Sequence, residues 1–144
     1  MRTPSYTLYL DHEVLTASPL RLVQLLYRGS LDSIAAARRY LKLGDIRSRS
    51  RAISKAQRLI TELSRSLNVA EGGEVGQNLS KIYAYVLKLL ITANTQQLDP
   101  PLEEAERLVG ALAEAWEANS SDPTEQQPAE PASEIEYEPL VCSY

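Results

Sequence analysis

His12 is the only histidine in the chain and the first residue whose chemistry suggests catalysis. A histidine base needs a nucleophile and an orienting acid that converge on it, as in a catalytic triad. Asp11 and Glu13 flank His12, but the side chains of adjacent residues do not converge on a helix or a strand. We therefore expect a solvent-exposed histidine, and the sequence predicts no catalytic residue.

Residues that could hold a metal or a phosphate group are also too few. Cys142 is the only cysteine, so neither an intramolecular disulfide nor a Cys/His metal cluster can form. Gly72 and Gly73 have a glutamate on each side and no lysine nearby, which favours a turn between helices over a phosphate loop. The sequence predicts no metal and no cofactor, and it favours a binding protein in a reducing cytoplasm over an enzyme.

Charge is divided unevenly along the chain. One side of the segment 46–68 carries Arg47, Arg51, Arg58 and Arg65, with Lys55 nearby, whereas residues 119–144 hold six acids and no base. Such a basic stripe could bind nucleic acid, but no recognition motif or aromatic stacking platform accompanies it. We expect a solvated face and no nucleic-acid partner, with the acidic segment folding back on the stripe at low salt as a hypothesis.

Helix caps and apolar periodicity predict four helices. Ser18 can cap the first turn and Pro19 suits the first helical position, while Gly44 suits the residue just after a helix end. The predicted helices cover residues 19–43, 46–68, 75–94 and 100–119. The expected fold is all-α: an antiparallel four-helix bundle over 18–119, an N-terminal segment 1–17 packed on it, and a disordered, acidic, proline-rich tail over 120–144.

The apolar surface of the first and third predicted helices is wider than one helix normally buries. In the first helix it forms two stripes about 140° apart, one through Leu22 and Leu26 and one through Leu20 and Tyr27. This excess predicts contact with further helices or with a partner. The apolar residues Tyr6, Tyr9 and Leu10 precede the first helix, and they suit either a permanent staple across the bundle or a removable cover. No stretch has the length and apolarity of a membrane span or the form of a signal peptide.

Ordered sequence blocks along residues 6–118 resemble one known family. They include YTLYLDHEVLTASP (6–19), LVQLLYRG (22–29), ISKAQRLITELSRSL (53–67), GGEVGQNL (72–79), IYAYV (82–86), LLITAN (89–94) and LAEAW (112–116). In this order and spacing they are similar to the flagellar secretion chaperone family FliS. Three departures stand out. Arg28 occupies a position where many relatives carry aspartate or asparagine, and Ala84 one where they carry aspartate. The long acidic tail is not part of the family's common core.

The resemblance implies a cytoplasmic chaperone, not an enzyme, that binds the disordered C-terminal segment of flagellin. It would prevent premature polymerisation and deliver flagellin to the flagellar type III export apparatus, whose components are further partners. Tyr6, Tyr9 and Leu10 would then form a cover that moves aside. The groove for flagellin is expected at Leu22, Leu26, Tyr27, Ile60, Leu63, Leu67, Leu79, Tyr83, Val86 and Leu90.

Two further expectations concern the oligomeric state and an alternative function. We expect a monomer or a weak dimer, without membrane insertion. The alternative function is a general helical interaction module that uses its wide apolar surface for self-association.

Overall fold

The computed structural model describes residues 18–70 and 73–120, and within them it consists of helices and short turns without a strand. The helices are α2 (Pro19–Leu43), α3 (Ile46–Ala70), α4 (Gly73–Gln96) and α5 (Asp99–Ser120). The predicted all-α bundle is confirmed. The chain divides into two compact units, Met1–Ala113 and Glu114–Tyr144, and the helix packing described below belongs to the first. The predicted N-terminal cover and acidic tail fall outside the described residues.

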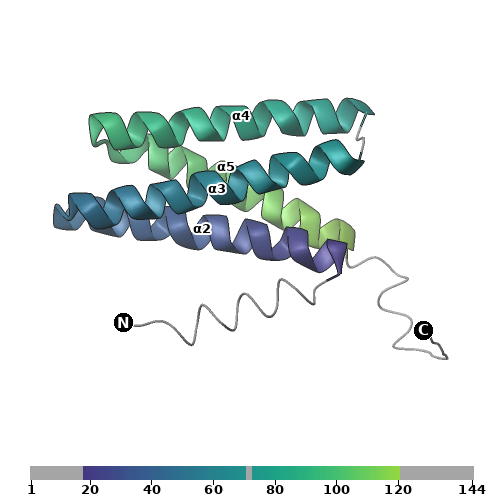
Figure 1. Cartoon of the computed structure of the whole chain (residues 1–144), viewed down its shortest axis with the longest axis horizontal. Helices are drawn as coiled ribbons and strands as arrows, with labels where there is room; N and C mark the ends of the chain where they lie inside the picture. Colours follow the sequence, from purple (N-terminus) through teal and green to yellow (C-terminus); the bar gives the residue numbers. More distant parts are fainter. Residues whose placement is uncertain (1–17, 71–72, 121–144) are drawn as a thin grey trace. The chain divides into compact units, whose positions relative to one another are not determined.

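The ends of α2 are set by its local sequence, as expected from its caps. The Ser18 hydroxyl accepts a hydrogen bond from the Arg21 amide at 3.2 Å. At the other end Gly44 adopts a left-handed φ of +74°, a conformation that glycine adopts without a steric penalty. Asp45 then caps α3, since its carboxylate accepts from the Ser48 amide at 3.1 Å. This two-residue turn reverses the chain, and α3 runs back along α2 (Figure 1).

The core face of α2 lies between the two predicted apolar stripes. Its centre is a seam of small buried residues, Ser30, Ser33 and Ala37, flanked by Tyr27 and Ile34. The Ser30 hydroxyl is satisfied within the helix, because it donates to the Leu26 carbonyl at 2.8 Å. Small side chains let a neighbouring helix approach closely, so the seam accounts for the burial of α2 better than either stripe alone.

The remaining core comes from one face of each of the other helices. Its most deeply buried side chains, at most 1% exposed, are Ile53, Ala56, Ile60, Val86, Leu90, Ala93, Leu102, Ala105 and Val109. Figure 1 shows α2, α3 and α4 running side by side, with α5 crossing them obliquely.

The start of α5 is fixed to α2 by charge. Asp99 is the first residue of α5, and its carboxylate accepts from Nε and Nη2 of Arg38 at 2.8 and 2.9 Å. Nη1 of the same guanidinium donates to Glu106 at 2.6 Å. The hydrogen bonds from Arg38 hold the pKa of Asp99 below its usual value. Arg38 therefore joins α2 to the first two turns of α5.

Arg49 is a buried arginine that the sequence analysis did not single out. It is only 4% exposed, and it donates to the side chains of Asn94 and Gln97 and to the Asn94 carbonyl at 3.3 to 3.4 Å. These acceptors belong to the last turn of α4 and the residue after it, where the helix dipole favours a cation. The sequence did indicate that Arg49 could be buried, because Arg49 lies on the same helix face as the buried residues Ile53 and Ala56, four and seven residues further on.

Candidate functional site

The ten residues predicted to line a client groove separate by burial. Three are half-buried: Leu22, Leu67 and Leu79. Seven are at most 8% exposed: Leu26, Tyr27, Ile60, Leu63, Tyr83, Val86 and Leu90. Side chains buried this deeply leave little or no surface for a second polypeptide to touch unless the bundle opens, so these seven would lie beneath a binding surface.

The three half-buried residues share one end of the bundle. Leu22 lies in the first turn of α2, Leu67 near the end of α3 and Leu79 near the start of α4, and these helix ends lie together in Figure 1. Two more apolar residues at this end are exposed, Leu20 by 57% and Val75 by 68%. We call Leu20, Leu22, Leu67, Val75 and Leu79 the end set. Burial deepens from the end set into the bundle, through Leu26 and Leu63 to residues with no exposure.

A close helix contact forms the base of this end. A Cβ atom built on Gly76 would lie 3.7 Å from Cδ1 of Leu67, which is ordinary van der Waals contact. The end of α3 therefore lies beside the start of α4, with room for one methyl group at ordinary contact distance. Leu67 is thus held on one side by α4, while part of its surface stays accessible to a partner.

A buried tyrosine pair lies one to two turns inside the end set. The hydroxyls of Tyr27 on α2 and Tyr83 on α4 are 2.6 Å apart, and the two residues are 4% and 3% exposed. Burial raises the pKa of both hydroxyls, so they stay neutral and share a hydrogen bond. The pair ties α2 to α4 and gives the floor beneath the end set a defined shape.

Among the residues that the structure describes, no group of three or more His, Cys, Asp or Glu side chains is placed to hold a metal ion. His12 and Cys142 fall outside those residues, as do the predicted cover residues Tyr6, Tyr9 and Leu10. The end set contains only aliphatic side chains, so its chemistry is the burial of apolar surface. Such a site can bind another polypeptide but cannot activate a substrate.

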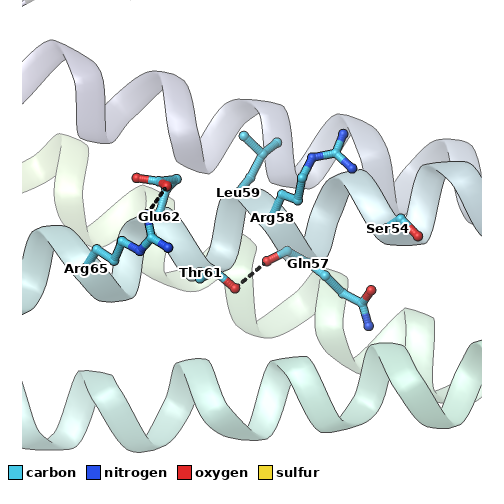
Figure 2. Close-up of a pocket in the computed structure, with 7 residues that line it drawn as sticks. All are labelled: Ser54, Gln57, Arg58, Leu59, Thr61, Glu62 and Arg65. Atoms are coloured by element: carbon cyan, nitrogen blue, oxygen red, sulfur yellow. Dashed lines mark hydrogen bonds and ion pairs between the residues drawn. The ribbon is translucent and has the colours of Figure 1, made fainter.

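A surface cavity of about 590 Å³ lies on the outer face of α3 (Figure 2). Among the described residues it is lined by Ser54, Gln57, Arg58, Leu59, Thr61, Glu62 and Arg65. Six of the seven lining residues are polar or charged, but apolar atoms contribute most of the lining surface. Figure 2 shows Arg65 turned toward Glu62, to which it donates at 3.1 Å. This cavity is separate from the end set and faces away from the core.

Comparison with known proteins identifies the kind of protein to which this end set belongs. The family model described as "Flagellar protein FliS" matches residues 1–123. The chain belongs to the FliS family. Similar proteins include the flagellar secretion chaperone FliS of Salmonella typhimurium, with 36% identity over 107 residues that cover 74% of this chain and 79% of that protein.

Two other members of the FliS family match over a similar span. Flagellar secretion chaperone FliSB of Pseudomonas aeruginosa is 32% identical over 111 residues, which are 77% of this chain and 88% of that protein. FliS of Bacillus subtilis is 32% identical over 111 residues, 77% of this chain and 82% of that protein. The predicted resemblance to the FliS family is confirmed, and with it the class of flagellar export chaperone.

Membership of the FliS family agrees with the physical character of the described residues. A chaperone binds polypeptides, and accessible aliphatic side chains such as those of the end set are the kind of surface that polypeptides cover. None of the helices between residues 18 and 120, as far as the structure describes them, has the length and apolarity needed to cross a membrane.

Proposed function

We propose that this chain is a cytoplasmic chaperone that binds the disordered C-terminal segment of flagellin, keeps flagellin from polymerising early and delivers it to the flagellar export apparatus. The observation that carries the proposal is the end set, a group of accessible aliphatic side chains at one end of a bundle from the FliS family. Membership of the family indicates a flagellar client, and the end set is a surface that an unfolded apolar segment could cover.

Binding an unfolded segment requires several apolar contacts at once. Ordering the segment costs about 2 to 5 kcal/mol or more, while each large side chain that becomes fully buried contributes about 1.5 to 3 kcal/mol. Two contacts, at about 3 to 6 kcal/mol, would do little more than offset the ordering cost. The five members of the end set are therefore an appropriate number for stable binding, and the buried residues below them keep the surface rigid.

The N-terminal residues complete the proposal. Residues 1–17, with Tyr6, Tyr9 and Leu10, act as a cover that leaves the client site when flagellin arrives. Flagellin then replaces residues 1–17 on the same apolar surface. The free energy of flagellin binding is therefore smaller than it would be on a bare surface. Residues 18–119 form the chaperone domain in this scheme, and residues 120–144 form a separate tail.

The first test of the proposal is co-purification of the full chain with flagellin that is intact or truncated at its C-terminus. We expect only intact flagellin to be retained, as a one-to-one complex of a chaperone that is monomeric alone by light scattering. Equal retention of both forms would count against the proposed client segment. Self-association without any flagellin binding would favour a general interaction module.

A matched pair of variants tests the site itself. Leu20 and Ile46 are 57% and 56% exposed, and each lies at the start of a helix, but Ile46 lies at the opposite end of the bundle. We expect Leu20→Glu to weaken flagellin binding about tenfold or more, the loss of one apolar anchor. Ile46→Glu should leave affinity unchanged while circular dichroism shows both variants folded. The reverse result would remove the end set from the client site.

A further inference from the structure

The outer face of α3 is strongly basic and has little acidic compensation. Five basic side chains on this face are exposed: Arg47, Arg51, Lys55, Arg58 and Arg65. We call this group the α3 basic face. Glu62 is the only acid within α3, and its carboxylate is engaged by Arg65 at 3.1 Å. The face thus presents a line of cations along most of the helix.

The acid at the start of α3 has another partner. Asp45 lies close enough for its charge to act on Arg47 and Arg51, but its carboxylate caps α3 through the Ser48 amide. Within residues 18–70 and 73–120, Arg65 is the one member of the basic face with a carboxylate at ion-pair distance.

The α3 basic face also has room for larger side chains. The cavity on α3 lies in the middle of this face, between the hydroxyl of Ser54 and the Arg65–Glu62 pair (Figure 2). Leu59, which is half-buried, contributes an aliphatic side chain to its lining. A ligand for this face would therefore combine negative charges with apolar side chains.

Residues 121–144 of the same chain have this composition. They contain six acids and no base, and the run EIEYE at 134–138 alternates glutamate with Ile135 and Tyr137. In an extended backbone every second side chain lies on the same side, about 6.6 to 6.8 Å apart. Arg47, Arg51 and Lys55 recur every four residues, about 6 Å along a helix axis. The two charge patterns have nearly the same repeat.

We propose that the α3 basic face binds the acidic residues 121–144 of this chain, with the glutamates of 134–138 opposite its cations. The structure does not describe these residues, and the proposal rests on their sequence and on the charge of the α3 basic face. Their length is sufficient, because 24 residues can span up to about 80 Å when fully extended, whereas the 25 residues of α3 measure about 37 Å. The proposal is independent of the identity of the export client.

Cys142 makes the proposal testable in the full chain, because it is the only cysteine and can carry a single nitroxide label. We expect the label to broaden amide NMR signals around Arg51 and Arg58 at about 0.1 M salt and to lose this effect at about 1 M salt, since the Debye length falls from about 10 Å to about 3 Å. Dilution of the labelled chain with unlabelled chain should leave the broadening intact. Loss on dilution would show contact between two copies and would overturn binding within one chain.

A matched pair of double variants identifies the surface. Arg51→Glu/Arg58→Glu reverses two exposed charges seven residues apart on α3, and Lys81→Glu/Lys88→Glu makes the same change at the same spacing on α4. The first variant should abolish the broadening and the second should retain it. Broadening that survives the α3 reversal, or is absent from α3 at low salt, would overturn the proposal. So would binding of duplex DNA to α3 while the signals of residues 121–144 stay unchanged.

Discussion

Removal of one hydroxyl from the buried tyrosine pair should destabilise the whole bundle. In Tyr27→Phe the hydroxyl of Tyr83 loses the partner that lies 2.6 Å away, in a site where that residue is only 3% exposed. A buried polar group without a partner costs about 1 to 3 kcal/mol. At about 4 °C per kcal/mol for a domain of this size, the melting temperature should fall by about 4 to 12 °C.

The control for this substitution is Tyr85→Phe, the same change two residues from Tyr83. The Tyr85 hydroxyl donates to Glu104 at 2.7 Å, but the side chain is 44% exposed and water can replace the lost partner. Its effect should stay within about 0.5 kcal/mol. Both free energies of unfolding can be measured by urea denaturation followed by circular dichroism, with unchanged m-values as the test of two-state unfolding.

The double variant Tyr27→Phe/Tyr83→Phe separates the hydroxyl pair from other effects. Because neither ring then carries an unpaired hydroxyl, its loss should be smaller than the sum of the two single losses. Additive losses would refute the idea of a coupled pair, and a Tyr27→Phe variant as stable as the parent would refute burial of the pair.

Alkaline pH gives an independent measure of the tyrosine pair. Burial raises the pKa of both hydroxyls above the unfolded value, so their contribution is complete below about pH 10 and is lost as the pH rises further. The unfolded chain then releases protons that the native chain keeps. The stability of the double variant should therefore fall less steeply above about pH 10 than that of the parent.

Three further predictions concern the helix ends and the α2–α5 contact. Gly44→Ala should cost about 1 kcal/mol, because φ is +74° and an added Cβ would meet nothing within 4 Å that could offset the strain. Gly110→Ala should instead stabilise the bundle by about 0.5 to 1 kcal/mol, since its Cβ would lie 3.9 Å from Cδ2 of Leu31 within a regular helix; thermal melts of the two variants that shift in the same direction would contradict this. Arg38→Met should lower the free energy of unfolding by about 1 to 2 kcal/mol at neutral pH. Because Arg38 lowers the pKa of Asp99, that difference should be complete above about pH 4 and narrow as acid protonates the carboxylate; a gap that persists at pH 2 would mean that charge is not its cause.

The helix boundaries could be predicted because their causes are local. Ser18, Pro19 and Gly44 act within one turn of their own positions, and α2 begins and ends where they indicate. The connection at 71–72 was harder to place, because Gly73 is also the first residue of α4. A glycine can end one helix or begin the next, so the start of α4 was predicted two residues late.

The core face of α2 could not be predicted from hydrophobicity. Ser30 and Ser33 are polar, yet they are 0% and 6% exposed, because their small size lets another helix approach. The two apolar stripes flank this seam, which explains why the apolar surface of α2 looked too wide for one helix. Arg49 was missed for a related reason, since its burial depends on oxygens of α4 that are distant in sequence.

The predicted client groove combined two kinds of position because helical periodicity specifies a face and not a depth. Leu22 and Leu26 share one stripe, but Leu22 lies at the bundle end and is half-buried, whereas Leu26 is 8% exposed. The same holds for Leu67 and Leu63 on α3. Distance from the bundle end decides which residues of a stripe are accessible, and that distance depends on how the helices are aligned with one another.

This difference in depth decides which substitutions can test binding without loss of the fold. A charge at Leu63 or Val86, which are 2% and 0% exposed, would be buried without a partner. The expected result there is unfolding, so reduced flagellin binding by such a variant would reveal nothing about the client site. A charge at Leu20 stays in water and removes only the apolar contact. Loss of binding by Leu20→Glu in a folded chain is therefore the result that distinguishes a client surface from a core.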